Sequence, residues 1–469
     1  MVNSRGIGAS VEHPQYGQGT ITAIYRNGSE WLVRFESGLR FRRPRQEFIG
    51  EQASSLAPAA PLPSLDGQPM PPSRYAARQL LEALRVGVAP VQHIKALTIG
   101  LESERASLAE GLAAAHQTGG AVRAVIGEYG FGKTHLVELT AQEALERNFL
   151  VATTSLDLGE TPAHRAVAIY SSLLRGLRYP DSDERGLEPL IDKALAVSNW
   201  RGHLWSATSE ANDPLDVGLY AIDATSSARQ RKAWREWLSG GRRTPIMAKG
   251  LPRGIKFPSI YTVGHNGRQI AYLLSGISVL ARLAGYSGLC VLIDEAESYS
   301  LLAAYQRPKA DEFFSALIYA ALQERQMRIT PAMLPQHRWR DYPPAYSGRQ
   351  SLFFLFTVTR SENRLPLESW LDDGQVLNLE PHQSAQEIGQ FMQQVMGYHS
   401  QAYGYEVDER QRQVRRAAAE HLALGMKAGR LSIRGVVRLT VDLFDLLYLL
   451  PRLRGARAAG RAAAADAVN

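Results

Sequence analysis

The sequence has almost no cysteine: Cys290 is the one thiol among 469 residues. A single thiol excludes internal disulfides and cysteine-based zinc or iron–sulfur sites, and it suits a reducing compartment. Long apolar runs are also missing, because no stretch approaches the roughly 18 apolar residues of a membrane span. Residues 1–6 lack the apolar segment of a signal peptide. We therefore expect a soluble, cytoplasmic protein without a membrane partner.

Acidic residues do not predominate. The chain has 53 lysine and arginine residues against 46 aspartate and glutamate residues, a formal net charge of +7. Only eight of the basic residues are lysine, so arginine dominates. This moderate excess fits an anionic partner such as nucleic acid but does not require one. With 45 % hydrophobic residues, the chain has material for about two to four domains.

A small β module is predicted at the N-terminus, over residues 1–50. Four short runs separated by turn residues are predicted as its strands: Thr20–Tyr25, Glu30–Glu36, Arg40–Arg42 and Phe48–Ile49. This spacing fits an SH3- or Tudor-like β-barrel. Residues 51–73 combine six prolines with alanine, serine and glycine, which predicts a linker that forms no packed core.

Helix and strand patterns alternate from residue 74 onward. Five apolar runs are predicted as strands: Val122–Ile126, Phe149–Thr154, Leu289–Ile293, Leu352–Val358 and Val376–Leu379. Because helical stretches separate them, the pattern predicts an α/β core with a parallel sheet over residues 74–380. Residues 180–258 interrupt the alternation and are interpreted as an insertion. A helical lid over 381–451 and a flexible Ala/Arg tail over 452–469 complete the predicted order.

One glycine-rich segment matches the phosphate-binding pattern G-x-x-x-x-G-K-T. Its residues are Gly127, Glu128, Tyr129, Gly130, Phe131, Gly132, Lys133 and Thr134. The glycines allow a tight turn whose backbone N–H groups point at phosphate oxygens, and the following helix adds its positive N-terminal end. We expect Lys133 to reach the β- and γ-phosphates of ATP, and the Thr134 hydroxyl to bind Mg²⁺.

A later strand ends in two carboxylates, Asp294 and Glu295. A buried parallel strand delivers its C-terminal residues to the ligand edge of the sheet. We therefore expect Asp294 to bind Mg²⁺ opposite Thr134. Glu295 is then placed to deprotonate the water that attacks the γ-phosphate. The adjacent pair favours a hydrolysing ATPase over a small-molecule kinase.

Other polar residues are candidate sensors of the nucleotide. Thr357 and Thr359 lie at the end of a predicted strand, where each either contacts the γ-phosphate or only caps the strand. Arg434 begins the last helix and either reaches the nucleotide or lies on the surface. An arginine acting on a neighbouring subunit would stabilise transition-state charge. Three candidates for it precede the fourth strand, and the sequence does not choose among them: Arg338, Arg340 and Arg349.

Residues 229–256 combine many cations with two tryptophans and a single acid, Glu236. Cations for phosphates interleaved with aromatic rings for bases indicate nucleic-acid binding. The candidate DNA-binding residues are Arg229, Arg231, Lys232, Trp234, Arg235, Arg242 and Arg243. The alternative, weighed about equally, is a solvated insertion whose tryptophans pack on the core.

The order of these motifs resembles AAA+ ATPases, which belong to the additional-strand class of P-loop proteins. The stretch from about Ala77 to Leu450 is also similar to the ATP-binding proteins of bacterial BREX-type phage-defence islands, of the BrxC/BrxD kind. Five groups of residues carry this resemblance: Leu81–Gly87, Gly127–Thr134, Asp157 with Thr161, Pro162 and His164, Leu289–Glu295, and Ser432–Arg438. The resemblance implies ATP binding and hydrolysis, genes beside helicases and methyltransferases, and action on DNA in defence.

The N-terminal module resembles a different set of proteins. Val11–Ile21 is similar to the Tudor-like modules of UvrD-type helicases and to RNA-polymerase-interacting modules of the CarD type. In those families the module contacts a protein or DNA. A barrel on a flexible linker favours such a docking role. The alternative is a barrel whose glycines only shape its turns.

Together these features predict an oligomeric, DNA-associated AAA+ ATPase in phage defence. It would use ATP and Mg²⁺ to control its engagement of DNA, with duplex favoured, and of a partner helicase encoded nearby or another defence protein. The alternative function is an ATP-gated adaptor that recruits a helicase or RNA polymerase with little turnover. A small-molecule kinase is disfavoured by Asp294 and Glu295 and by the large insertion.

Overall fold

The computed structural model describes most of the chain. The described residues are 8–13, 17–25, 30–35, 40–44, 71–88, 90–205, 207, 213–248, 257, 261, 266–325, 328–335, 342–346, 350–361, 363–380 and 383–466, with backbone alone at 13, 17, 24–25, 40–44, 297, 324, 331 and 450–466. The chain divides into two compact units, Met1–Pro71 and Pro72–Asn469.

The N-terminal unit contains a four-stranded antiparallel sheet. Its strands follow each other in space as in sequence: β1 (Ser10–His13), β2 (Gly17–Tyr25), β3 (Glu30–Phe35) and β4 (Arg40–Pro44). Along β3 every second side chain is buried, which places Trp31, Val33 and Phe35 in one small core. The predicted small β module is therefore confirmed, whereas the strand expected at Phe48–Ile49 lies outside the described residues.

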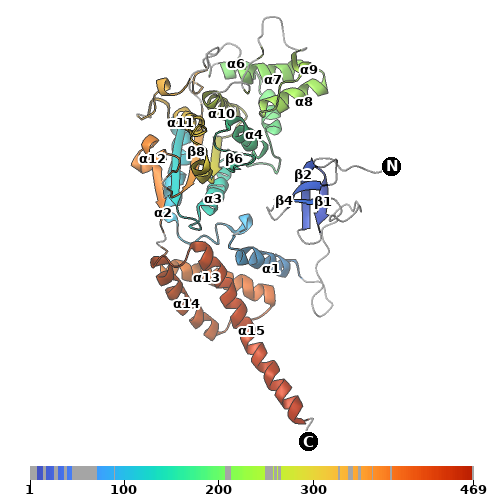
Figure 1. Ribbon diagram of the computed structural model, residues 1–469, viewed down its shortest axis with the longest axis vertical. Coiled ribbons are helices and arrows are strands. Elements are labelled where there is room, and N and C mark those ends of the chain that lie inside the picture. Colours follow the sequence, from blue (N-terminus) through green and yellow to red (C-terminus); the bar gives the residue numbers. More distant parts are fainter. Residues whose placement is uncertain are drawn as a thin grey trace, which may run out of the picture. The chain divides into compact units, whose positions relative to one another are not determined.

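The second unit is built on a five-stranded parallel sheet (Figure 1). In chain order its strands are β5 (Gly120–Gly127), β6 (Phe149–Ser155), β7 (Gly288–Asp294), β8 (Leu352–Thr359) and β9 (Val376–Leu379). Their order in space is β6-β7-β8-β5-β9. One additional strand, β8, thus lies between the strand that ends in the glycine-rich segment and the strand that ends in the acid pair. All five predicted strands are confirmed, and so is the parallel α/β core.

Helices cover both faces of this sheet because its strands are apolar on both sides. On one face, α2 (Glu102–Thr118) and α3 (Lys133–Glu146) pack against alternate residues such as Phe353 and Leu355. The residues between them, such as Phe354 and Phe356, belong to a larger core with the helices of the opposite face. Those helices are α4 (Ala166–Arg175), α10 (Gly267–Leu283) and α11 (Arg307–Leu322).

The interruption after α4 folds as short helices on the larger core. They are α5 (Glu188–Leu195), α6 (Trp200–Trp205), α7 (Pro214–Ala224), α8 (Ala228–Leu238) and α9 (Pro245–Ala248). Asp213 and Ser227 begin α7 and α8 by accepting hydrogen bonds from backbone N–H groups of the first turn. Shorter turns of helix occur at Val91–His93, Ala296–Leu301, Gln323–Arg325, Pro331–Met333, Leu367–Trp370 (α12) and Asp373–Gln375.

The C-terminal helices form a helical module with a fourth helix from the start of the unit. α13 (Ala385–Tyr403), α14 (Glu409–Lys427) and α15 (Ile433–Asp466) share one core with α1 (Pro72–Arg85), which lies beside them in Figure 1. Capping boxes at Ser384 and Asp408 begin α13 and α14. The sequence had assigned residues 74–85 to the nucleotide-binding core and residues 452–469 to a flexible tail. The structure instead packs α1 into the helical module. The backbone of α15 continues to Asp466, within the predicted tail, whose flexibility stays a prediction.

None of the helices in the described part of the chain is both long enough and apolar enough to cross a bilayer.

Candidate functional site

The glycine-rich segment has the predicted strand–loop–helix setting. β5 ends at Gly127 and α3 begins at Lys133. Gly130 and Gly132 have φ angles of 84° and 94°, a left-handed conformation that a side chain disfavours. The sequence predicted that Gly127 allows a tight turn, but the structure gives it another role. A Cβ at this position would lie 2.9 Å from Cβ of Leu379 on the neighbouring β9, so glycine is needed for the close approach of the two strands.

The two polar residues that begin α3 are differently placed. Lys133 is 7 % exposed, and its Nζ donates hydrogen bonds to the carbonyl oxygens of Gly127 (3.0 Å) and Glu128 (3.2 Å). The ammonium group is thus held over the loop. Thr134 is exposed at the helix N-terminus, where its hydroxyl is accessible to a ligand.

The acid pair lies at the carboxyl end of β7 and is held by the adjacent strands. The Thr357 hydroxyl donates a hydrogen bond to Oδ1 of Asp294, a carboxylate that is 5 % exposed. The same Thr357 oxygen accepts a hydrogen bond from the backbone N–H of Glu295 (3.3 Å). Ser155, at the end of β6, donates a hydrogen bond to Oε2 of Glu295 (2.6 Å).

Glu295 has a strained backbone, with φ 58° in the left-handed region. A non-glycine residue in that region costs of order 1 kcal/mol or more, and such strain concentrates at functional sites. The exposed carboxylate is consequently directed by both its backbone and Ser155.

Thr357 and Thr359 are separated by the structure. Thr357 is fully buried and contacts the acid pair. Thr359 is paired in register with Gly127 of β5, and its buried Oγ1 has no hydrogen-bond partner among the described residues. Thr357 thus contacts the acid pair and Thr359 lies beside the start of the loop, while contact of either with the γ-phosphate stays a prediction.

The start of α15 lies against the glycine-rich loop. Nη1 of Arg434 donates a hydrogen bond to the hydroxyl of Tyr129 (2.5 Å), and its guanidinium carbon is 5.1 Å from the centre of that ring. The backbone N–H of Arg434 also donates to the carbonyl oxygen of Gly130 (3.4 Å). These contacts bring Arg434 to Tyr129 of the loop, which lies 305 residues earlier in the chain.

The loop, the acid pair and Arg434 line one cavity of about 380 Å³. Its polar wall contains Lys133, Thr134, Asp294, Glu295 and Arg434. The remaining wall is mostly apolar and is formed mainly by the segment 84–101 and by the helical module, with Leu84, Val91, Ile94, Leu97, Phe391 and Ile433. A charged wall beside an apolar one suits a ligand with a phosphate chain and a flat apolar ring.

The oxygens of Thr134 and Asp294 suit a hard cation. Magnesium prefers oxygen ligands and usually keeps several waters, so one hydroxyl and one carboxylate suffice beside substrate phosphates. Across the described residues, no cluster of three or more histidine, cysteine, aspartate or glutamate side chains forms a metal site made of protein ligands alone. The donor set therefore fits Mg²⁺ bound together with a nucleotide.

His135 lines the same cavity next to Thr134. Its Nε2 is 2.9 Å from Oγ1 of Thr98, whose hydroxyl donates to the carbonyl oxygen of Ile94 (2.7 Å). Burial lowers the pKa of His135 to about 4. The ring is therefore neutral near pH 7 and joins α3 to the segment before α2.

The predicted base-stacking role of Trp234 is wrong. Trp234 and Trp237 are 1 % and 2 % exposed and pack on each other with ring centres 5.4 Å apart. Both rings also contact Phe257, with ring centres 5.1 Å apart in each pair. The rings occupy the core of the insertion, as the alternative interpretation expected, and neither is available to stack on a base.

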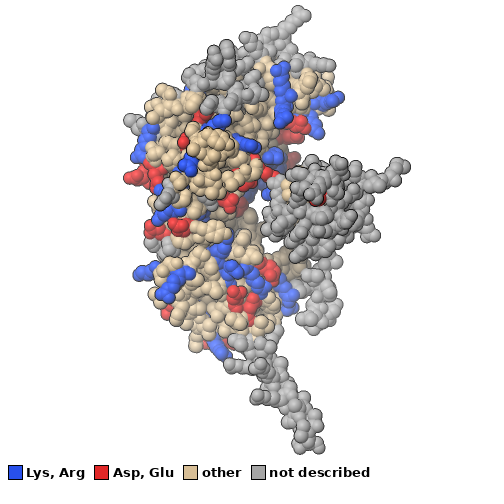
Figure 2. Space-filling model, viewed as in Figure 1, with Lys and Arg blue, Asp and Glu red and all other residues tan. Residues whose placement is uncertain are grey.

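The cations of this segment differ in exposure and in their partners. Lys232 forms an ion pair with Glu236 on the same helix (3.9 Å). Arg235 forms ion pairs with Asp192 and Glu188 on α5, which makes it part of the packing between helices. Arg243 lies with its guanidinium carbon 4.3 Å from the ring centre of Phe257. Five cations are exposed: Arg229, Arg231, Lys232, Arg242 and Arg243. Figure 2 shows blue side chains at the end of this unit where Figure 1 labels α8 and α9.

Several predicted residues lie outside the described part of the chain. They are the remaining cations of the basic segment, Lys249, Arg253 and Lys256, and the three candidates for an arginine acting on a neighbouring subunit, Arg338, Arg340 and Arg349.

Two contacts of the site were missed by the sequence reasoning. The hydrogen bond from Ser155 to Glu295 follows from strand register, because Ser155 pairs with Asp294 across β6 and β7. Polar residues at the ends of neighbouring parallel strands meet at one edge, so the position of Ser155 was a usable signal. The contact of Tyr129 with Arg434 joins distant segments and had no signal in the sequence.

Comparisons with known proteins agree with part of the resemblance. Residues 73–210 match the family model of the BREX system ATP-binding protein BrxC/D. This match includes α1 and the glycine-rich loop and ends before the acid pair, so the resemblance predicted over Ala77–Leu450 is confirmed for that segment. Among solved structures, the Walker-type ATPase Paby2304 of Pyrococcus abyssi aligns over 78 % of this chain and 77 % of that chain, with 10 % identity and a TM-score of 0.31. No curated protein matches the chain.

Proposed function

We propose that this protein is an ATPase of the AAA+ type that acts in a BREX-type phage-defence system. The observation that carries the proposal is the single cavity that unites Lys133 and Thr134 with Asp294 and Glu295. The additional strand β8, which positions the acid pair through Thr357, fits the same class. The family match over residues 73–210 supports both ATP as the ligand and defence as the setting.

Each side chain has a defined task in hydrolysis. Backbone N–H groups of the loop and Lys133 bind the phosphates. Thr134 and Asp294 would hold Mg²⁺, which neutralises phosphate charge when bound. Ser155 orients Glu295 by its hydrogen bond to Oε2, and the carboxylate would accept a proton from the attacking water. Arg434 lies on the loop from the helical module and adds positive charge beside the phosphates.

The first experiment is steady-state ATP hydrolysis by the full chain, with Lys133→Ala as the blank. We expect hydrolysis above the blank, and its loss on the order of 10²-fold or more in Glu295→Gln with ATP still bound. ATP binding without hydrolysis in the wild-type protein, alone and with duplex DNA, would contradict the ATPase and leave the ATP-gated adaptor. An active Glu295→Gln variant would contradict the role of Glu295 as the base.

Binding of duplex DNA is the second part of the proposal. The exposed cations Arg229, Arg231 and Lys232 on α8 support it, because lysine and arginine contacts with phosphates supply most non-specific affinity for DNA. We expect the triple alanine variant at these positions to bind duplex DNA more weakly. The slope of the logarithm of affinity against the logarithm of salt concentration should become shallower by the equivalent of up to about three phosphate contacts.

A matched variant separates a local DNA site from a general effect of net charge. Arg410, Arg412 and Arg416 are exposed on α14, and replacing these three with alanine removes the same charge elsewhere. Equal loss of affinity in both triple variants would contradict a DNA site on α8. Absence of DNA binding by the wild-type protein at moderate salt, with and without ATP, would contradict DNA association altogether.

Assembly and partners complete the proposal. We infer a homo-oligomer that forms when ATP is bound, with a helicase or another defence protein as its partner and with the N-terminal module as the docking element. Mass measurement of Glu295→Gln with and without ATP tests the oligomer, since this variant retains the nucleotide. A monomer under both conditions would contradict it.

A further inference from the structure

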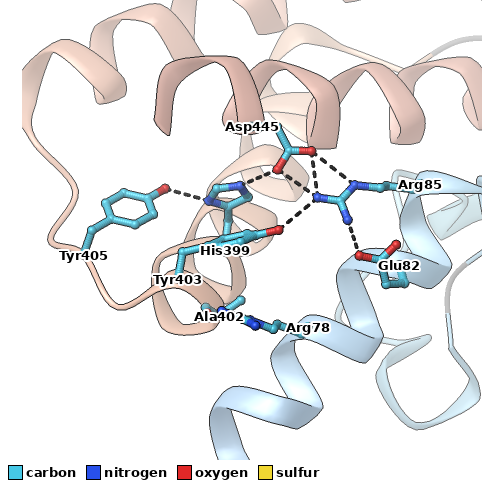
Figure 3. Close-up of polar contacts among 8 residues, drawn as sticks. All are labelled: Arg78, Glu82, Arg85, His399, Ala402, Tyr403, Tyr405 and Asp445. Atoms are coloured by element: carbon cyan, nitrogen blue, oxygen red, sulfur yellow. Dashed lines mark hydrogen bonds and ion pairs between the residues drawn. The ribbon is translucent and has the colours of Figure 1, made fainter. Parts of the chain in front are cut away.

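The turn at the end of α1 has no contact with phosphates in the proposed mechanism, although Leu81–Gly87 belongs to the residues that carry the family resemblance. In the structure this turn is fixed to the helical module through Arg85. Nη2 of Arg85 is 2.8 Å from Oδ1 and 2.7 Å from Oδ2 of Asp445 on α15, and Nε donates to Oδ2 (3.1 Å). This arrangement ties the last turn of α1 to the middle of α15 (Figure 3).

Two side chains of α13 also contact the ion pair between Arg85 and Asp445. Nε2 of the fully buried His399 is 3.0 Å from Oδ1 of Asp445, and Nη2 of Arg85 donates to the hydroxyl of Tyr403 (3.1 Å). Both His399 and Tyr403 belong to α13 and point toward Arg85 and Asp445 in Figure 3. The position of α1 relative to α13 and α15 is therefore set by several hydrogen bonds.

Gly87, two residues after Arg85, lies directly against the side chain of Arg434. Gly87 has φ 79°, a left-handed conformation that glycine adopts readily because it has no side chain. A Cβ on Gly87 would overlap Cγ of Arg434, lie 3.1 Å from its Cδ and 3.4 Å from its carbonyl oxygen. The stem of Arg434 therefore occupies the space that any larger residue at position 87 would fill.

From this position the stem directs the guanidinium group of Arg434 onto the loop. The group donates to the Tyr129 hydroxyl and lies over the Tyr129 ring, as described above. Gly87, Tyr129 and Arg434 all line the cavity. The Arg434 side chain, which reaches the loop from the helical module, thus packs against Gly87 in the turn that follows α1.

We propose that Gly87 is a positioning residue for Arg434: its missing side chain admits the arginine stem, and Arg85 holds the turn where that space is needed. The inference rests on the proposed function, because the task of Arg434 at the nucleotide is part of it. A Cβ atom added at position 87 would push the Arg434 side chain aside and displace its guanidinium group. A displacement of about 1 Å within a site can reduce the rate on the order of 10²-fold.

The test compares Gly87→Ala with Gly429→Ala in the full chain. Gly429 also has positive φ, 67°, but a Cβ there meets no atom within 4 Å. Both variants therefore carry the strain of alanine in the left-handed region, and only Gly87→Ala displaces Arg434. We expect kcat/KM for ATP to fall about 10- to 100-fold in Gly87→Ala and to stay within about twofold of wild type in Gly429→Ala.

The double variant Gly87→Ala with Arg434→Ala separates positioning from general damage. Truncating Arg434 removes the overlapping stem, so we expect Gly87→Ala to cause no further loss of kcat/KM in that background. If Gly87→Ala reduces kcat/KM by the same factor with and without Arg434, or no more than Gly429→Ala does, the inference is wrong.

The same variants distinguish failure of the inference from failure of the proposed function. If the wild-type protein binds ATP but does not exceed the Lys133→Ala blank, the ATPase proposal fails. The positioning role is then measured by the affinity for ATP in the same four variants, where we expect the same non-additive pattern. Additive losses of affinity would overturn the inference there as well.

Discussion

Thr357 is the side chain on which the geometry of the acid pair depends. Its hydroxyl donates to Asp294 and accepts from the backbone N–H of Glu295, and the Thr357 and Asp294 side chains are both buried. Replacing it by valine keeps the shape but leaves a buried carboxylate oxygen and a backbone N–H without this partner. We expect Thr357→Val to lower the free energy of unfolding by about 1–3 kcal/mol and to reduce ATP hydrolysis. Urea denaturation and steady-state hydrolysis measure the two effects.

Thr359→Val is the matched control for this prediction. It makes the same change two residues away on the same strand, where the buried hydroxyl has no hydrogen-bond partner among the described residues. We expect no loss of stability, because no hydrogen bond within that part of the chain is broken. If both variants were destabilised equally, the contact of Thr357 with Asp294 would not be the cause.

His135 makes stability depend on pH below neutrality. Burial lowers its pKa to about 4 in the folded protein, whereas an unfolded histidine titrates near 6.5. Protonation therefore favours the unfolded state, so this contribution is complete above about pH 6.5 and is lost as pH falls toward 4. We expect His135 to account for about 2 kcal/mol of lost stability between pH 7 and pH 5.

The comparison of wild type with His135→Gln isolates this effect. Carboxylates also lower stability in acid, but they contribute to both proteins, so the difference between the two curves belongs to His135. Urea denaturation at several pH values between 7 and 5 measures it. Parallel curves for the two proteins would contradict a lowered pKa of His135.

At the residue scale, the sequence predicted the loop and the acid pair because these residue types are required at fixed spacing. It did not distinguish Thr357 from Thr359, since residues two apart on a strand share a face and only the contact with Asp294 separates them. It weighed a nucleic-acid surface for Trp234 about equally with packing on the core, although a signal for burial was present. Trp234, Trp237 and Leu238 follow the spacing of one helix face, which predicts a buried stripe.

The closeness of α2 to the sheet depends on a glycine within that helix. A Cβ on Gly111 would lie 2.7 Å from Cε2 of Phe353 on β8. Alanine is favoured over glycine within a helix by about 1 kcal/mol, but overpacking a core typically costs about 1–3 kcal/mol. We expect Gly111→Ala to lower the free energy of unfolding or at best leave it unchanged, measured by urea denaturation.

Gly397 within α13 provides the opposite case. It is exposed, and a Cβ there meets no atom within 4 Å. We expect Gly397→Ala to raise the free energy of unfolding by about 0.5–1 kcal/mol, because helix propensity is then the main change. A similar gain in Gly111→Ala would show that α2 adjusts to the added methyl group without cost.

At the element scale, most helices and strands of the second unit were predictable because their apolar patterns are long and regular. The sequence did not predict which helices pack against α1. Its buried residues Leu80, Leu81 and Leu84 predict an apolar face, but a stripe on a helix does not identify what covers it. The covering helices begin about 300 residues later, and this separation led the sequence reasoning to assign α1 to the neighbouring core.

For the whole molecule, the two units each have their own core. The N-terminal sheet buries Val11, Ile21, Trp31, Val33 and Phe35, while all residues that line the cavity belong to Pro72–Asn469. We expect a fragment of residues 72–469 to fold and to bind ATP within about twofold of the affinity of the full chain. Calorimetric titration with ATP measures this affinity.

A fragment that unfolds, or that binds ATP more than about tenfold more weakly, would contradict the independence of the second unit. The full chain at the same ionic strength is the control. Lys133→Ala in the fragment confirms that the measured binding occurs at the loop.

The packing of α1 has a consequence for synthesis on the ribosome. The chain emerges from its N-terminus at about 5–20 residues per second, so α1 is made about 15–60 s before α13. During that time Leu80, Leu81 and Leu84 have no partner helix. Arg434 is made later still, which leaves the cavity incomplete until the start of α15 has been translated. The apolar face of α1 therefore stays uncovered while the intervening chain is made, and the cavity is completed only after the start of α15 has emerged.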